Sequence, residues 1–280
     1  MYHPLTETKT KPKEKFMTNK NKNANFLNAD WWKTATVEDV KAEIVKGADI
    51  NARDPEWTTP LMLAACYADL KVVKLLADNK ADINARDIHR QTPLMHASVR
   101  NHNPQLIEFL VAAGADINAV NFEGSTPVLL ACMNKEPKIL TTLLRLGAKA
   151  DTPNNEGTTP LMQAACSFNP QEIKMLIEFG ADIKAKDHRG GTALMYAAQY
   201  SANPEVIKLL VDLGCDVNAK DNEGGTPLFH ATTWNSNLEI TTTLIKLGAD
   251  TDIKDVDSRK ACDYADHNAN PEVAGLFTLN

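Results

Sequence analysis

A four-residue string, Thr-Pro-Leu-Met, returns at nearly fixed intervals and constrains the fold of this 280-residue chain more than any other feature. Counting TPVL, TALM and TPLF as variants, its copies begin at Thr59, Thr92, Thr126, Thr159, Thr192 and Thr226. A second column, interrupted once, consists of Gly47, Lys80, Gly114, Gly147, Gly180, Gly214 and Gly248. Both columns advance in steps of 33 or 34 residues. The sequence therefore predicts an array of similar units and not a single globular core.

Each repeat predicts two short helices. Threonine can cap the first helix, and the proline after it takes the first helical position, where a missing N–H costs nothing. A second helix follows, with apolar residues at helical spacing such as Val206, Ile207, Leu209 and Leu210. The column glycine ends that helix in a left-handed conformation, and the next stretch turns back as a hairpin-like loop. Lys80 is expected to adopt the same strained backbone and to be a local weak point.

These features resemble the ankyrin-repeat family, whose pattern is Thr-Pro-Leu-His-x-Ala with a period of 33 residues. The resemblance covers about residues 25–280 and implies an all-α ankyrin-repeat solenoid of helix-turn-helix units with short β-hairpin loops. It would comprise an N-terminal cap at residues 25–46, repeats beginning at 47, 80, 114, 147, 180 and 214, and a C-terminal capping repeat at 248–280. Methionine, leucine or phenylalanine replaces the family's histidine, so packing must take over its role in joining neighbouring repeats.

Charge and composition limit the class of protein. Residues 1–24, rich in lysine and outside the repeat columns, are expected to be a disordered tail. Residues 1–23 carry +4 and the whole chain −6, so the repeats are acidic, which argues against nucleic-acid binding. No apolar run could span a membrane, and no signal peptide is visible. Five scattered cysteines are typical of a reducing compartment, so we expect a cytoplasmic protein; export without a cleaved signal stays open. We also expect the chain to be a monomer.

Candidate catalytic and metal-binding groups fit the repeat pattern better than an active site. His89, His96 and His102 share one repeat, but their spacings match no zinc motif. Cys66 and Cys166 share a column where a small residue packs on the first helix. No nucleotide or nucleophile motif occurs. We expect no metal, no cofactor and no enzymatic activity; the alternative is an enzyme, or a regulatory subunit of an enzyme, with an unrecognised site.

The surface offers a site of another kind. The family resemblance implies a concave binding face made by loop tips and exposed positions of the first helices. In two adjacent repeats these positions hold His188, Arg189, Tyr196, Tyr200, His230 and Trp234. Interface energy concentrates in aromatic and arginine side chains, so we predict a site for a partner protein, with the chain as adaptor, inhibitor, scaffold or effector. The alternative is that these residues pack together as ordinary repeat surface. The column of Tyr200 also predicts exposed side chains at Tyr67, Arg100, Asn134, Ser167 and Asn268.

Overall fold

The computed structural model describes residues 22–134, 136–166, 169–265 and 268–277. It divides at Ala115 into two compact units, each a stack of short helices. Within the described ranges the β pairing consists of one isolated antiparallel bridge, between Lys254 and Lys260. In the same ranges no helix is long and apolar enough to cross a membrane. Most of the predicted disordered tail, residues 1–21, lies outside the described residues.

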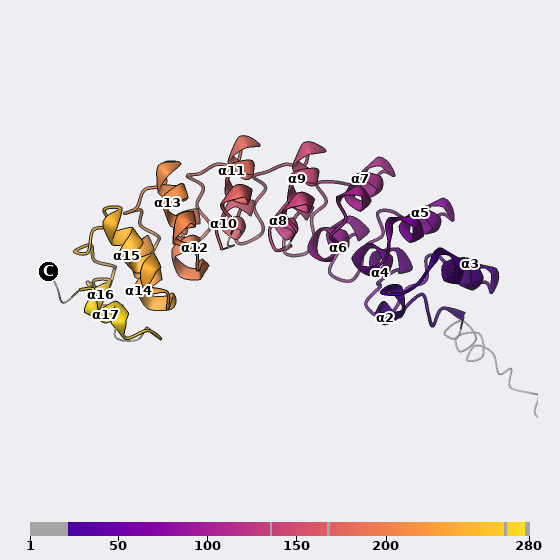
Figure 1. Cartoon of the computed structure of the whole chain (residues 1–280), viewed down its shortest axis with the longest axis horizontal. Helices are drawn as coiled ribbons and strands as arrows, with labels where there is room; N and C mark the ends of the chain where they lie inside the picture. Colours follow the sequence, from indigo (N-terminus) through magenta and orange to yellow (C-terminus); the bar gives the residue numbers. More distant parts are fainter. Residues whose placement is uncertain (1–21, 135, 167–168, 266–267, 278–280) are drawn as a thin grey trace, which may run out of the picture. The chain divides into compact units, whose positions relative to one another are not determined.

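The first unit stacks helices in pairs. Its helices are α2 (Ala29–Trp32), α3 (Val37–Val45), α4 (Pro60–Tyr67), α5 (Leu70–Asp78), α6 (Pro93–Arg100) and α7 (Pro104–Ala112). First helices pack on first helices (α2 on α4, α4 on α6), and second helices on second helices (α3 on α5, α5 on α7), as Figure 1 shows. Leu61, Leu76, Leu94 and Leu106 are fully buried between them, so each repeat buries its apolar face only against its neighbours.

The second unit repeats this arrangement from Asp116 onward. Its first helices are α8 (Pro127–Ala131), α10 (Pro160–Ala165), α12 (Ala193–Tyr200), α14 (Pro227–Trp234) and α16 (Cys262–Ala265). Its second helices are α9 (Pro137–Arg145), α11 (Pro170–Glu178), α13 (Pro204–Asp212), α15 (Leu238–Lys246) and α17 (Glu272–Gly275). Each helix packs on the equivalent helix of the next repeat, so α12 lies against both α10 and α14 (Figure 1).

The threonine of each repeat caps its first helix as the sequence predicts, with one exception. The hydroxyls of five column threonines accept the backbone N–H three residues on; they are Thr59, Thr92, Thr126, Thr159 and Thr192. The Thr226 hydroxyl makes no such bond and is buried without a hydrogen-bond partner. Methionine fills the family's histidine position in four repeats as a buried side chain: Met62, Met95, Met162 and Met195. These methionines take part in the close packing between first helices.

Left-handed backbone recurs at two places in each repeat. Lys80 has φ +68°, beside column glycines at φ +83° to +102°, which confirms that this lysine occupies a position suited to glycine. A second left-handed position ends each loop, at Gly124, Gly157, Gly190 and Gly224. Trp57, Arg90 and Ser258 adopt it too, at φ +61° to +63°. The sequence prediction missed these three, because no glycine marked the position.

Asparagine side chains join one loop to the next. Nδ2 of Asn51 donates to the Lys80 carbonyl at 3.0 Å, and its Oδ1 accepts the Asp82 N–H at 2.8 Å. Asn218 makes the same two bonds to the following repeat, at 3.2 and 2.8 Å. Asp151 stands in this column, and its Oδ1 is buried without a hydrogen-bond partner. Paired amide bonds therefore join several neighbouring repeats, whereas this column holds Asp151 and Lys184 in place of an amide in two others.

The amide bonds extend to the start of the described chain. Asn23 accepts the Asp49 backbone N–H on its side-chain oxygen at 2.8 Å, as Asn51 does one repeat later. Its carbonyl accepts the Leu27 N–H at 3.0 Å. Asn23 thus bonds to the N-terminal cap and to the first repeat, although it was expected to belong to the tail.

Candidate functional site

The loops of the second unit are held by hydrogen bonds that need no partner protein. Oδ1 of Asp187 accepts the N–H groups of Arg189 at 2.8 Å and Gly191 at 2.7 Å, which closes the loop tip. The Asn222 N–H then donates to the Arg189 carbonyl at 2.9 Å, so that adjacent tips are joined through their backbones. The loop tips therefore present their side chains from a fixed frame.

The second carboxylate oxygen of the loop aspartate reaches the first helix. The Tyr196 hydroxyl on α12 donates to Oδ2 of Asp187 at 2.8 Å. One repeat later, Nε2 of His230 on α14 lies 3.0 Å from Oδ2 of Asp221. Tyr196 and His230 occupy equivalent positions, and each is half-buried. Both side chains thus fix the loop against the helix, a role that the sequence analysis did not foresee.

All six predicted site residues line one hollow of about 550 Å³ between these loops and the helices α12 and α14. Tyr200 and Trp234, at the ends of the two helices, are 58% and 67% exposed. His188 and Arg189 lie at the exposed loop tip opposite. The structure therefore brings the predicted residues together; that they bind a partner stays a prediction.

The interpretation that these aromatic residues only pack on one another fits part of the set. The rings of Tyr196 and Tyr200 are 6.4 Å apart between centroids, and Tyr200 accepts a 2.9 Å bond from Gln199. In the described ranges, however, Trp234 has no aromatic ring contact. An indole exposed to this extent is not explained by packing within the repeats.

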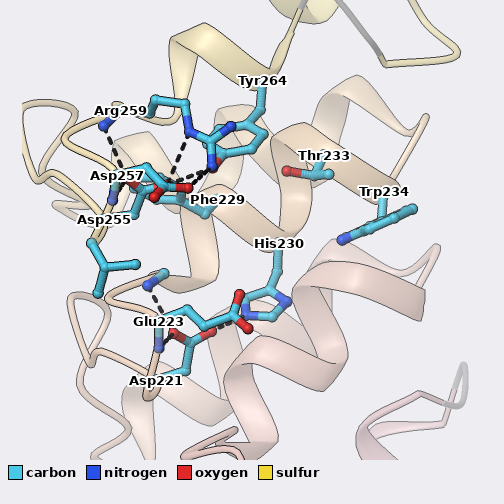
Figure 2. Close-up of a pocket in the computed structure, with 12 residues that line it drawn as sticks. Asp221, Glu223, Phe229, His230, Thr233, Trp234, Asp255, Asp257, Arg259 and Tyr264 are labelled. Carbon is cyan, nitrogen blue, oxygen red and sulfur yellow. Dashed lines mark hydrogen bonds and ion pairs between the residues drawn. The ribbon is translucent and has the colours of Figure 1, made fainter.

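The hollow continues into the closing repeat, where a second space of about 180 Å³ adjoins it (Figure 2). The two spaces share Asp221, Glu223, His230 and Trp234 among their lining residues. This extension was not predicted, because residues 248–280 were expected to form only a cap. A usable signal was present, since four repeats hold an Asp nine residues before a His or Tyr: 87/96, 187/196, 221/230 and 255/264.

Burial and hydrogen bonding shift the acidities of these paired groups in opposite directions. Burial raises the pKa of Asp221, but bonds from His230 and from the Gly225 and Glu223 N–H groups outweigh it and hold the pKa below its ordinary value. Burial is also the main reason that the pKa of Tyr196 rises to about 12. At neutral pH the hollow therefore holds the ionised carboxylate of Asp221 and the neutral phenol of Tyr196, each bonded to a different partner.

The enzyme alternative finds its best geometry in the first unit. Sγ of Cys66 lies 3.6 Å from Nδ1 of His96, whose Nε2 lies 3.0 Å from Oδ2 of Asp87, an order of groups that a thiol nucleophile would need. Burial, however, raises the pKa of the Cys66 thiol to about 12, opposite to the shift that makes a reactive thiolate. The described residues also hold no cluster of three His, Cys, Asp or Glu side chains suited to a metal ion.

Of the other side chains predicted to be exposed, Asn134 is not, and Asn268 and Tyr67 are so only in part. Asn134 is buried, and Asn268 is half-buried with Nδ2 donating to the carbonyls of Thr232 at 2.8 Å and Asn235 at 3.0 Å. The repeat of Asn134 has one residue fewer before its second helix than the repeat of Trp234, so the column shifts inward there. Tyr67 is half-buried and Arg100 is exposed, while Ser167 lies outside the described residues.

Comparison with known proteins supports the repeat assignment. The model of the family described as ankyrin repeats (3 copies) matches residues 33–121, 98–187 and 167–255. Two solved structures resemble the chain over 79% of its length. One is the ankyrin repeat domain of Bcl-3, with 27% identity, a TM-score of 0.61 and 98% of that chain covered. The other is the human ASB11 ankyrin repeat domain, with 26% identity, a TM-score of 0.70 and 97% covered.

Two curated relatives match shorter stretches. The transient receptor potential cation channel subfamily A member 1 of Drosophila melanogaster is 30% identical over 100 residues. The putative ankyrin repeat protein FPV031 of fowlpox virus (strain NVSL) is 32% identical over 94 residues. Each match covers 33% of this chain, and the matches span only 8% and 28% of those proteins. The fold class inferred from the columns, all-α with paired helices in every repeat, is confirmed by these likenesses. With a family model matched over most of its length, this chain belongs to the ankyrin-repeat family.

Proposed function

We propose that this chain is a non-catalytic module that binds a partner protein in the hollow between the loop tips and the helices α12 and α14. The observation that carries the proposal is the exposure of Tyr200 and Trp234, at 58% and 67%, in the lining of a space of about 550 Å³. Ankyrin repeats are typically protein–protein interaction modules. Aromatic side chains on a rigid frame add binding energy with little loss of conformational freedom.

The wider role remains within this proposal. We infer an adaptor, inhibitor, scaffold or effector that acts as a monomer, with a cap at residues 25–46, repeats from residue 47 and a closing repeat at 248–280. All five cysteines are unpaired thiols, which supports a reducing compartment such as the cytoplasm. The buried thiol of Cys66, with its raised pKa, favours binding over the enzyme alternative.

The test is quantitative cross-linking and capture from a lysate of the source cells with the full chain as bait. Replacing Tyr200 and Trp234 together by alanine should lower recovery of the specific partner at least tenfold, because each such anchor contributes roughly 2 kcal/mol or more. Circular dichroism should show unchanged helical content.

Phe179→Ala is the matched control, since Phe179 is 43% exposed and ends α11, outside this hollow. Lys208→Ala, on the second helix α13, removes an exposed charge in the same unit and should also leave recovery unchanged. Full binding by the double variant, or its unfolding, would show that the aromatic pair is structural.

A further inference from the structure

The two adjoining hollows of the second unit hold an excess of negative charge. Their lining includes five carboxylates and two guanidinium groups: Asp187, Asp221, Glu223, Asp255, Asp257, Arg189 and Arg259. With the histidines neutral, this is a net charge of −3. The loop aspartates already accept bonds within the protein, so what matters for an incoming group is which carboxylate is unused.

Glu223 is the carboxylate without a partner. It lies between the two hollows and lines both. The Glu223 N–H donates to Oδ1 of Asp221 at 2.9 Å, and the Glu223 carbonyl accepts the Val256 N–H at 2.9 Å. Among the described residues its carboxylate makes no hydrogen bond or ion pair, and Figure 2 shows it extending toward His230. The backbone of Glu223 is thus held in place, while its exposed carboxylate has its binding capacity unfilled.

The closing repeat shows what fills the equivalent place. The Arg259 guanidinium lies over the Tyr264 ring, 4.8 Å from its centroid. The same guanidinium pairs with Asp255 at 3.6 Å and with Asp257. Tyr264 also donates its hydroxyl to Asp255, as Tyr196 does to its own loop aspartate. In this repeat an arginine of the chain itself occupies the space between the loop carboxylates and the aromatic ring of the first helix.

The two preceding repeats leave this place open. The residues equivalent to Arg259 are Gly225 and Gly191, one and two repeats earlier. A Cβ added at Gly225 would meet Oδ2 of Asp221 at 2.9 Å, so glycine leaves the space beside that carboxylate open. Of these two repeats, the one with Gly225 presents Glu223 and the exposed indole of Trp234.

We propose that the partner supplies an arginine side chain to this place, above Gly225, with its guanidinium against Glu223 and its stem and plane across Trp234. This inference rests on the proposed function and names the chemistry that it recognises. Arginine suits the site better than lysine, because a planar guanidinium can both stack on an aromatic face and bind a carboxylate through two N–H groups.

The probe is a set of random ten-residue peptide pools, each with one fixed central residue: arginine, lysine, leucine or glutamate. Binding of each pool to the full chain is measured by fluorescence anisotropy. The arginine pool should bind at least fivefold more tightly than the leucine and glutamate pools. Glu223→Gln should reduce that preference to less than twofold.

Two further variants sharpen the test. Glu156→Gln removes the glutamate at the equivalent loop position two repeats earlier, outside both hollows, and should keep the full arginine preference. Gly225→Arg gives this repeat its own arginine, as the closing repeat has, and should abolish binding of the arginine pool while helical content is retained.

The outcomes separate this inference from the proposed function. Equal binding of the leucine or glutamate pools, or an arginine preference that survives Glu223→Gln, overturns the inference. If such pools still depend on Tyr200 and Trp234, the hollow binds peptides and the proposed function stands. If no pool distinguishes the wild type from the Tyr200→Ala/Trp234→Ala variant, both fail.

Discussion

Replacing Asp151 by asparagine should stabilise the protein, because the column of Asp151 joins repeats through amide groups. Asn51 and Asn218 each donate one bond and accept another across the repeat boundary, at 2.8–3.2 Å. Asp151 accepts the Asp182 backbone N–H, but a carboxylate has no donor, and its Oδ1 stays buried without a partner. The variant restores the missing donor and removes the charge of a half-buried carboxylate in one step.

The magnitude follows from those two changes. A neutral hydrogen bond contributes about 1 kcal/mol net, and relieving a buried unsatisfied oxygen contributes on the order of 1 kcal/mol more. We therefore expect the free energy of unfolding to rise by about 1–2 kcal/mol at pH 7, measured by urea titration followed by circular dichroism. The reverse swap, Asn218→Asp, should lower it by a similar amount.

The pH dependence gives a second, independent check. Burial, the largest cause, raises the pKa of Asp151 above its ordinary value of 3.8. A group whose pKa is higher in the folded state destabilises the fold above that pKa, and the penalty vanishes below the unfolded value. The advantage of asparagine should therefore shrink between pH 7 and pH 3.5. A gain that is absent at pH 7, or equal at both pH values, would refute this account.

Two other predictions concern the backbone and the N-terminus. Lys80→Gly should raise the free energy of unfolding in urea by up to about 1 kcal/mol, since it removes left-handed strain at φ +68°, less the greater chain entropy of glycine in the unfolded state; a loss would show that Asn79 closes the helix instead. Deleting residues 1–21 should leave the melting temperature unchanged within about 1 °C, whereas Asn23→Ala should lower the free energy of unfolding by about 1 kcal/mol through loss of the bond to Asp49. Equal melting temperatures for the full chain and the Asn23→Ala variant would place the cap boundary after Asn23.

Structural features that recur in every repeat could be predicted from the sequence, because the same residue type recurs wherever the backbone requires the same conformation. The left-handed backbone of Lys80 followed from the glycines around it in the column. Trp57 also adopts a left-handed conformation, at the loop end, but tryptophan is not a residue type that indicates a positive φ. The backbone conformation of a repeat position must therefore be assigned to every repeat, including those in which another residue replaces glycine.

The candidate site was predictable only in part for a related reason. Tyr200 and Trp234 stood out because the fold does not require large aromatic residues there. Glu223 did not stand out, since glutamate is ordinary at a loop tip and its lack of a partner depends on side-chain geometry. The bond between Tyr196 and Asp187 also depends on distance, although their spacing of nine residues recurs in other repeats.

The buried methionines of the first helices have a chemical consequence. Met62, Met95, Met162 and Met195 are at most 1% exposed, whereas Met133 is 58% exposed. A peroxide can convert a methionine to its sulfoxide only when the sulfur is reached, so oxidation at each buried position requires that its repeat open first. The oxidation rate of each buried methionine, measured peptide by peptide by mass spectrometry, therefore reports the local opening of its repeat. Met133 serves as the exposed reference.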